Sequence, residues 1–390
     1  MIAFAPSDDH KLMMDAGQKL SKALAGRVRE TEKGGGLPED LASAARELGV
    51  GVVHLPEAVG GAGLGLVAGV LLEEEIAAGD PATAFALGGT GAYALAMSEL
   101  ASPELAQDAA ATAGAVAFGE PRPHRDRPGL STIATKKADA FVLHGEKAYV
   151  LGAGKAERFV VFAQVDESKG ERGIGAFLVS RGDGVKATAR VRTLGLDAAS
   201  FGGLVLDGAR GVLISDEPRA MVRFFAKHAL LNAARCVGLA RAAFDVTRAY
   251  VEQRRAFGKP VAHFQAVAFT VADRAMDVEA SRALVWRAAW LWDAASDVEG
   301  ENAALLASAR AIAHAHETAM QTADDGVQLH GGAGFMRDYP VEKYMRDAKQ
   351  LSLYGMPAAC AEQLAAAIEL GRAPDLALVL PFADSQSAFT

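Results

Sequence analysis

Two adjacent arginines open a stretch of the sequence suited to binding an anion, YVEQRRAFGKPVAHFQ (residues 250–265). Arg254 and Arg255 precede a Phe-Gly-Lys-Pro turn, and a helical pattern starts directly after it. A planar guanidinium group suits phosphate oxygens, and free backbone N–H groups at a helix start suit anions in general. The stretch therefore predicts a phosphate-binding turn, although a solvated basic helix end explains the same residues equally well.

A second stretch, QLHGGAGFMRDYPVEKYMRDAK (residues 328–349), combines glycines with polar side chains. Three glycines in four positions allow the backbone to approach a bulky ligand closely. The Gln328 amide adds two hydrogen-bond donors and one acceptor. As a pattern, the stretch indicates either a turn that contacts a ligand or a tight loop that binds nothing.

Other patterns are weakened by their spacing. GGAGLG (60–65) does not follow a strand and lacks the G-x-G-x-x-G spacing, which argues against a Rossmann dinucleotide loop. His314 and His316 are two residues apart, so they point to different faces of a helix and predict no metal site. Trp286 and Trp290 are four residues apart, which fits core or interface packing rather than a base-stacking surface.

The composition is that of an ordinary globular protein. The chain has 390 residues, 51% of them hydrophobic, and its net charge of −8 argues against a nucleic-acid binder. Cys236 and Cys360 are expected to be buried thiols in a reducing compartment. The N-terminus lacks the pattern of a signal peptide, and no apolar run reaches the roughly 18 residues of a membrane span. We therefore expect a cytoplasmic protein without a membrane span.

The elements that must position these stretches fall into zones. Residues 1–114 read as helices, and residues 115–215 contain short β-branched or aromatic runs broken by Gly, Asp and Lys. Without helical patterns between those runs, an antiparallel barrel or sandwich is expected rather than a parallel sheet. The helical period returns over residues 216–372, as in a bundle, and residues 373–390 form a loosely attached tail. The predicted fold class is α+β.

The chain resembles the acyl-CoA dehydrogenase family. LPEAVGGAGLGLVAGVLLEEEIAAGD (55–80) and the two stretches described above occur in the order and spacing of that family, and the resemblance covers about residues 38–365. It implies an N-terminal helical domain, a middle β-domain and a C-terminal four-helix bundle, assembled as dimers or tetramers. It also implies that FAD lies between the β-domain and the bundle, partly across a subunit interface.

The resemblance assigns FAD contacts to positions of this sequence. Arg254 matches the arginine that reaches the FAD pyrophosphate. Gln328 and Gly332 match groups that meet the adenosine half from a neighbouring subunit. The remaining matching positions are Phe257, Gly258 and Gln265 on the pyrophosphate side, and less closely Gly119, Tyr149 and Leu151 on the side of the flavin ring. Leu151 stands where the family has a threonine, so it offers no hydroxyl there.

The resemblance also implies a reaction, α,β-dehydrogenation of an acyl-CoA thioester, with electrons passed to an electron-transferring flavoprotein. A glutamate usually removes the α-proton, but Gly355 follows Tyr354 at that position. The alternative position of the base, on an earlier bundle helix, is occupied by His228. His228 is thus the one named candidate for the catalytic base, and a buried core histidine is the plainer interpretation.

Three functions remain open from the sequence. The chain is an active dehydrogenase with its base elsewhere, or a non-catalytic subunit that completes the FAD site of a second family member in a hetero-oligomer. The third possibility is flavin chemistry that needs no α-proton base, or binding alone.

Overall fold

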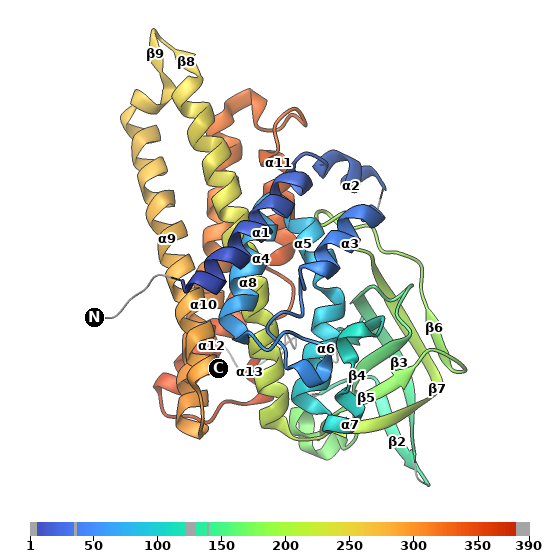
Figure 1. Cartoon of the computed structure of the whole chain (residues 1–390). Helices are drawn as coiled ribbons and strands as arrows, with labels where there is room; N and C mark the ends of the chain where they lie inside the picture. Colours follow the sequence, from blue (N-terminus) through green and yellow to red (C-terminus); the bar gives the residue numbers. More distant parts are fainter. Residues whose placement is uncertain (1–5, 35–36, 122–128, 139, 380–390) are drawn as a thin grey trace.

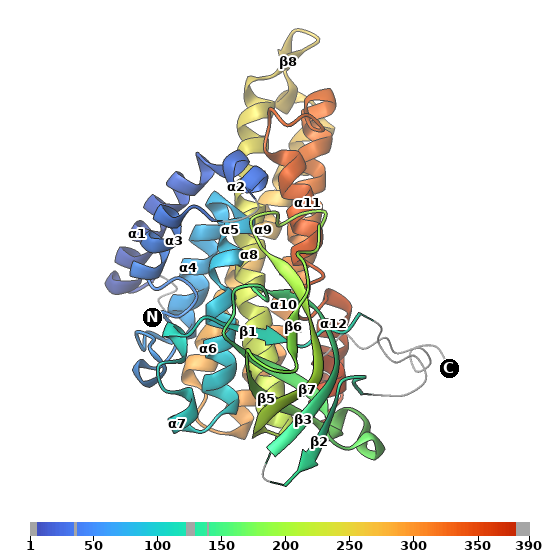
Figure 2. The same ribbon diagram turned by 90° about the vertical axis from the view of Figure 1, so that its right-hand side faces the viewer.

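The computed structural model describes residues 6–34, 37–121, 129–138 and 140–379. A helical bundle stands upright in Figure 1, the N-terminal helices pack along it, and a sheet lies beside its lower end. The view in Figure 2 shows the sheet in front of the lower part of the bundle, while the β8 turn projects at the opposite end. No described helix is both long and apolar enough to cross a bilayer.

The N-terminal part is built around α4 (Gly65–Gly79), which is buried between α1 and α8 and pairs its glutamates Glu73, Glu74 and Glu75 with arginines of α8. Asp80 begins the next helix by accepting a hydrogen bond from the Thr83 backbone N–H at 3.2 Å, with Pro81 in the first turn. The other helices of this part are α1 (Asp8–Ala25), α2 (Val28–Gly34), α3 (Glu39–Glu47), η1 (Glu57–Val59), α5 (Pro81–Leu87), α6 (Gly89–Leu100), α7 (Pro103–Ala106) and η2 (Ala109–Ala111).

The middle part is a sheet whose pairings close into a ring, β4-β2-β3-β7-β5 and back to β4. Of the predicted barrel or sandwich, the barrel is therefore the form that the structure shows, since the sheet closes on itself. One feature departs from the expectation of antiparallel pairing, because β1 and β2 both pair with β4 in parallel. The strands are β1 (Gly114–Ala117), β2 (Ile133–Lys137), β3 (Ala140–Leu151), β4 (Arg158–Gln164), β5 (Ile174–Ser180), β6 (Val185–Ala187) and β7 (Phe201–Ser215), with η3 (Glu167–Gly173) between β4 and β5.

The C-terminal part is a helical bundle in which α10 packs against α8, α9, α11 and α12. A small hairpin joins α8 to α9 at one end of the bundle. The elements are α8 (Pro218–Gln253), β8 (Arg255–Ala256), β9 (Lys259–Pro260), η4 (Val261–His263), α9 (Gln265–Ala294), α10 (Val298–His330), η5 (Gly331–Ala333), α11 (Val341–Leu351), α12 (Ala358–Glu369) and α13 (Leu376–Val379). The predicted helix–sheet–helix order of an α+β chain is confirmed.

The expectation of a loose tail is wrong for its first residues. Leu376 and Val379 of α13 are buried, and the short helix packs against α8 and α12. Removing these two apolar side chains from water favours the docked position of the helix. The remainder of the tail lies outside the described residues.

Candidate active site

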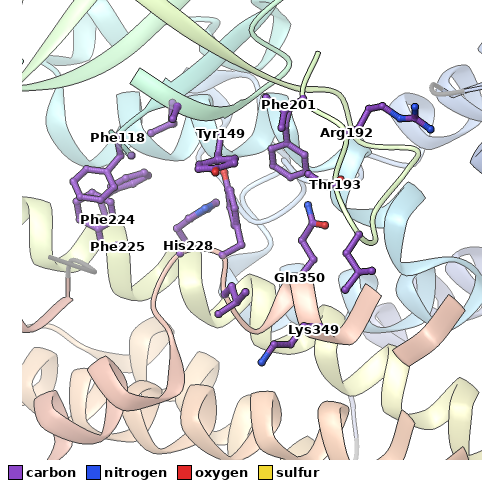
Figure 3. Close-up of a pocket in the computed structure, with 18 residues that line it drawn as sticks. Phe118, Tyr149, Arg192, Thr193, Phe201, Phe224, Phe225, His228, Lys349 and Gln350 are labelled. Carbon is purple, nitrogen blue, oxygen red and sulfur yellow. The ribbon is translucent and has the colours of Figure 1, made fainter. Parts of the chain in front are cut away.

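A cavity of about 610 Å³ lies between the middle domain and the bundle (Figure 3). Its sheet side is formed by Phe118 and Gly119 directly after β1, Tyr149 in β3 and Phe201 at the start of β7. A cavity of this size and apolar character is typical of a binding site for an organic ligand.

The bundle closes the cavity with aromatic side chains and one glycine. Phe224, Phe225 and His228 come from α8, whereas Tyr354 and Gly355 come from the turn that follows α11. The structure therefore brings Gly119, Tyr149, His228 and Gly355, which the sequence analysis singled out separately, to one cavity.

Tyr149 lies at an irregularity of β3. The pairing of β3 with β7 shifts register between Lys147 and Val150, and Tyr149 has a left-handed φ of 54°. Its side chain faces the cavity and is 58% exposed. Non-glycine residues with this backbone conformation often mark functional sites. Leu151, by contrast, is buried in the core and is absent from the cavity wall.

A buried ion pair supports the wall behind Gly119. Lys147 donates to the Glu120 carboxylate at 2.9 Å and to the Phe118 carbonyl at 3.1 Å. Glu120 also accepts hydrogen bonds from the backbone N–H groups of Ser131 and Thr132 at 2.7 and 2.8 Å. Burial lowers the pKa of Lys147 to about 8, against the opposing effect of Glu120. The pair thus fixes the backbone that leads from β1 into the cavity wall.

The loop between β6 and β7 forms a third wall, which the sequence analysis missed. Arg192 and Thr193 line the cavity, and the Gln350 side chain, which points into it from α11 (Figure 3), accepts a hydrogen bond from the Gly195 backbone N–H at 3.1 Å. The Asp347 carboxylate likewise accepts a hydrogen bond from the backbone N–H of the next residue, Leu196, at 2.7 Å. The only signal in the sequence was the polar pair Asp347 and Gln350 near the end of a predicted helix. Such a pair carries no information about a loop some 150 residues away in the chain.

His228 is buried, with 9% of its surface exposed, and its ring lies in an aromatic setting. The imidazole is parallel to the Phe224 ring at 5.8 Å and perpendicular to the Tyr354 ring at 5.7 Å. Burial, helped by the charge of Arg235, lowers the pKa of His228 to about 3, and burial raises the pKa of Tyr354 to about 12. Both side chains are therefore neutral near pH 7.

Gly355 lies beside His228 and leaves room there. Its φ is +79°, and a Cβ built on it would meet nothing closer than His228 Cδ2 at 3.9 Å. Among the described residues, none that lines the cavity carries a carboxylate. Residues 122–128, which follow Gly119 and Glu120, lie outside the described residues.

The predicted pyrophosphate contacts lie at the other end of the bundle. Arg254 ends α8, Phe257 and Gly258 form the turn of the β8–β9 hairpin with left-handed φ values of 47° and 81°, and Gln265 begins α9. The Phe257 side chain is 95% exposed. The hairpin thus presents an arginine and a protruding ring to the outside of the molecule.

Gln328 and Gly332 belong to that same end. They flank His330, the last residue of α10. The imidazole ring of His330 stacks on the Tyr250 ring, with 4.1 Å between the ring centres. The Tyr250 hydroxyl also donates to the His330 carbonyl at 3.3 Å. Since Tyr250 precedes Arg254 by one helical turn, the arginine hairpin and the glycine turn come together in one chain.

The two groups of site residues are far apart within the chain. His228 lies in α8 and Arg254 directly follows the last residue of that uninterrupted helix, so 26 residues at about 1.5 Å each separate them by about 39 Å. That distance exceeds the length of an extended FAD molecule. One chain therefore does not bring its cavity and its arginine hairpin to the same dinucleotide.

The residues present fit the parts of FAD unequally. The flat aromatic walls and the Gly119 backbone suit a planar ring, and the arginine hairpin suits a pyrophosphate. On the Tyr149 side, Leu151 lies in the core, so its side chain gives a flavin neither a contact nor a hydroxyl.

Comparisons with known proteins agree with this architecture. Models of the acyl-CoA dehydrogenase N-terminal, middle and C-terminal domains match residues 7–111, 115–209 and 218–356. The Mycobacterium tuberculosis protein named "Probable acyl-CoA dehydrogenase FadE25" is 33% identical over 369 residues, covering 90% of this chain and 92% of that protein.

Solved structures give the same result. Butyryl-CoA dehydrogenase from Megasphaera elsdenii superposes with a TM-score of 0.86 at 27% identity, over 95% of this chain and all of that one. A glutaryl-coenzyme A dehydrogenase in complex with glutaryl-CoA superposes with a TM-score of 0.85 at 26% identity, over 96% of this chain and 98% of that one. The chain belongs to the acyl-CoA dehydrogenase family.

Proposed function

We propose that this protein is an FAD-dependent oxidoreductase that dehydrogenates an acyl-CoA thioester at its α- and β-carbons, in the cavity beside His228. One observation supports this function above the others. Gly119, Tyr149 and Gly355, which match the flavin and base positions of the family, come from three distant segments and line one cavity.

The chain's own residues suit a reaction away from water. A thioester carbonyl acidifies the α-carbon, and the aromatic side chains around His228 exclude solvent from a bound acyl group. FAD, when bound, supplies the acceptor for the β-hydrogen, which leaves as hydride. The low pKa of His228 makes its imidazole a weak base, so the assignment of the α-proton base stays open.

We further propose that Arg254, Gln328 and Gly332 of one subunit serve the cavity of another. The separation of about 39 Å along α8 supports this arrangement. The same end and flank of the bundle also expose large apolar side chains: Phe257, Phe269, Met276, Trp290 and Phe335. Large apolar side chains of this kind favour association, as a homodimer, a homotetramer or a heteromer.

The second candidate function is a non-catalytic partner subunit. Gly355 at the position of the usual glutamate favours it, because the chain can then lend Arg254 and Gln328 to a glutamate-bearing family member. This function predicts that the two proteins copurify and that only the pair turns over acyl-CoA.

Anaerobic spectroscopy of the purified chain tests the proposed function. The chain is reconstituted with FAD, desalted, and titrated with acyl-CoAs of several lengths while flavin absorbance is recorded. Retained yellow colour that bleaches with an acyl-CoA supports dehydrogenation, with an electron-transferring flavoprotein as the proposed acceptor. A chain that retains FAD without bleaching, or retains none, contradicts it, and activity restored by a glutamate-bearing partner supports the second candidate.

A further inference from the structure

The imidazole of His228 packs against aromatic rings but has no hydrogen-bonding partner among the described residues. More than nine-tenths of the residue is buried, yet neither ring nitrogen makes a hydrogen bond to any residue that the structure describes. Figure 3 shows the ring on α8 with a nitrogen directed into the cavity, below Tyr149. Because the ring faces the cavity, the hydrogen-bonding partner of its nitrogen must come from what occupies the cavity, water or a ligand.

The side chains around His228 limit the chemical class of the ligand group that can lie beside it. The flanking rings of Phe224 and Tyr354 are uncharged, and Gly355 leaves open space next to the imidazole. Arg192 and Lys349 also line the cavity, but their charged ends point away from His228 (Figure 3). An anionic group beside His228 would therefore be desolvated without a counter-charge, which is unfavourable.

A neutral imidazole offers one N–H donor and one nitrogen acceptor. His228 stays neutral at ordinary pH, since its pKa is lowered by burial to about 3. A hydroxyl group can pair with whichever ring nitrogen faces the cavity, because it both donates and accepts, whereas a carbonyl oxygen pairs only with the N–H and an alkyl chain with neither. A site with a buried polar group also discriminates against ligands that leave this group unpaired.

We propose that His228 binds a hydroxyl substituent on the acyl group, close to the thioester, so that the preferred substrate class is the 2- or 3-hydroxyacyl-CoAs. The position follows from Gly355, which matches the place of the residue that acts at the α-carbon in the family, and a Cβ built on it would lie 3.9 Å from His228 Cδ2. This inference rests on the proposed binding of acyl-CoA in the cavity.

Calorimetry on the FAD-loaded protein tests the inference with three ligands of equal chain length: hexanoyl-CoA, 2-hydroxyhexanoyl-CoA and 3-hydroxyhexanoyl-CoA. One hydroxylated ligand should bind roughly 10- to 100-fold more tightly than hexanoyl-CoA. His228→Phe, which keeps a flat ring, should remove that preference. His228→Gln, which keeps one donor and one acceptor, should restore part of it.

Phe225→Leu is the matched control, because it alters the same wall without touching the imidazole. It should change the affinities of all three ligands by similar factors. Thermal unfolding of each variant checks folding, and if His228→Phe does not fold, the comparison of ligands on the unmodified protein decides.

Each result has one meaning. Equal binding of the three ligands overturns the inference and leaves the proposed function intact. A loss of hexanoyl-CoA binding in His228→Phe as large as that of the hydroxylated ligand also overturns it, since the imidazole then contacts the thioester itself. Failure of all three ligands to bind, together with an unbleached flavin, contradicts the proposed function as well.

Discussion

The Asp347 carboxylate accepts a hydrogen bond from the backbone N–H of Leu196 at 2.7 Å, which joins helix α11 to the cavity loop of the middle domain. The same carboxylate contacts the Lys343 ammonium, which in turn donates to Asp80 at 2.7 Å at the start of α5. All three charged side chains are buried. One ion cluster therefore ties the three domains together behind the cavity.

Asp347→Asn should lower the free energy of unfolding by about 1–3 kcal/mol, because Lys343 keeps a single buried counter-charge. Urea unfolding near pH 7 measures the change. Asp197→Asn, at a partly exposed carboxylate 3.5 Å from Arg346, is the control and should change stability by less than about 0.5 kcal/mol. Equal stability of Asp347→Asn and the unmodified protein contradicts the role of the cluster.

Lys147→Met should be more damaging, about 3–5 kcal/mol, because it leaves the Glu120 carboxylate buried without its cation. The double variant Glu120→Gln, Lys147→Met should recover part of this loss, since both charges are then absent. Thermal and urea unfolding of the four proteins form the double-mutant cycle. Additive losses from the two single changes would show that the pair is not coupled.

Acid should destabilise the unmodified protein more than His228→Phe. Below about pH 6.5 the imidazole takes up a proton in the unfolded chain, whereas the folded chain resists protonation down to a pKa of about 3. The unfolded state then binds more protons, so stability falls with falling pH by about 1.4 kcal/mol per unit for this one group. Urea unfolding of both proteins between pH 7 and pH 4.5 measures the difference, and parallel pH profiles contradict it.

Arg254→Ala should reduce bound FAD more than roughly tenfold, if the arginine holds the pyrophosphate in a charge-assisted contact. The ratio of flavin to protein absorbance after desalting gives the result, and size-exclusion chromatography confirms that the assembly is unchanged. Arg248→Ala removes an exposed arginine from the same helix and should leave flavin content unaltered. Normal flavin content in Arg254→Ala refutes the assignment.

Gly355→Glu should create a base beside the α-carbon. The built Cβ has free space, although the left-handed backbone makes a side chain unfavourable by roughly 1 kcal/mol or more. Exchange of the α-hydrogens of an acyl-CoA in D2O, followed by mass spectrometry, should accelerate at least about tenfold. Gly355→Gln has the same size without the charge and should show no acceleration, and failure of Gly355→Glu to accelerate exchange would place the reacting carbon elsewhere.

Local patterns in the sequence predicted most of the fold. The three zones were predicted from helix caps of proline, aspartate and glycine, from short β-branched runs and from long helical periods. These signals are readable because the hydrogen bonds and side-chain spacing within each element are local. The parallel pairing of β1 with β4 and the docking of α13 were beyond such patterns, since both depend on segments distant in the chain.

The site divides in the same way. Residue types singled out Arg254 and Gln328 as candidates and the family resemblance added Gly355, because an arginine beside a turn or a glycine in place of a glutamate is visible without coordinates. Only the tertiary structure put the arginine hairpin about 39 Å from the cavity, joined Leu196 to Asp347 by a hydrogen bond, and placed His228 and Gly355 on one cavity wall. Those relationships arise from the packing of separate domains, and packing is decided by shape and burial across long sequence separations.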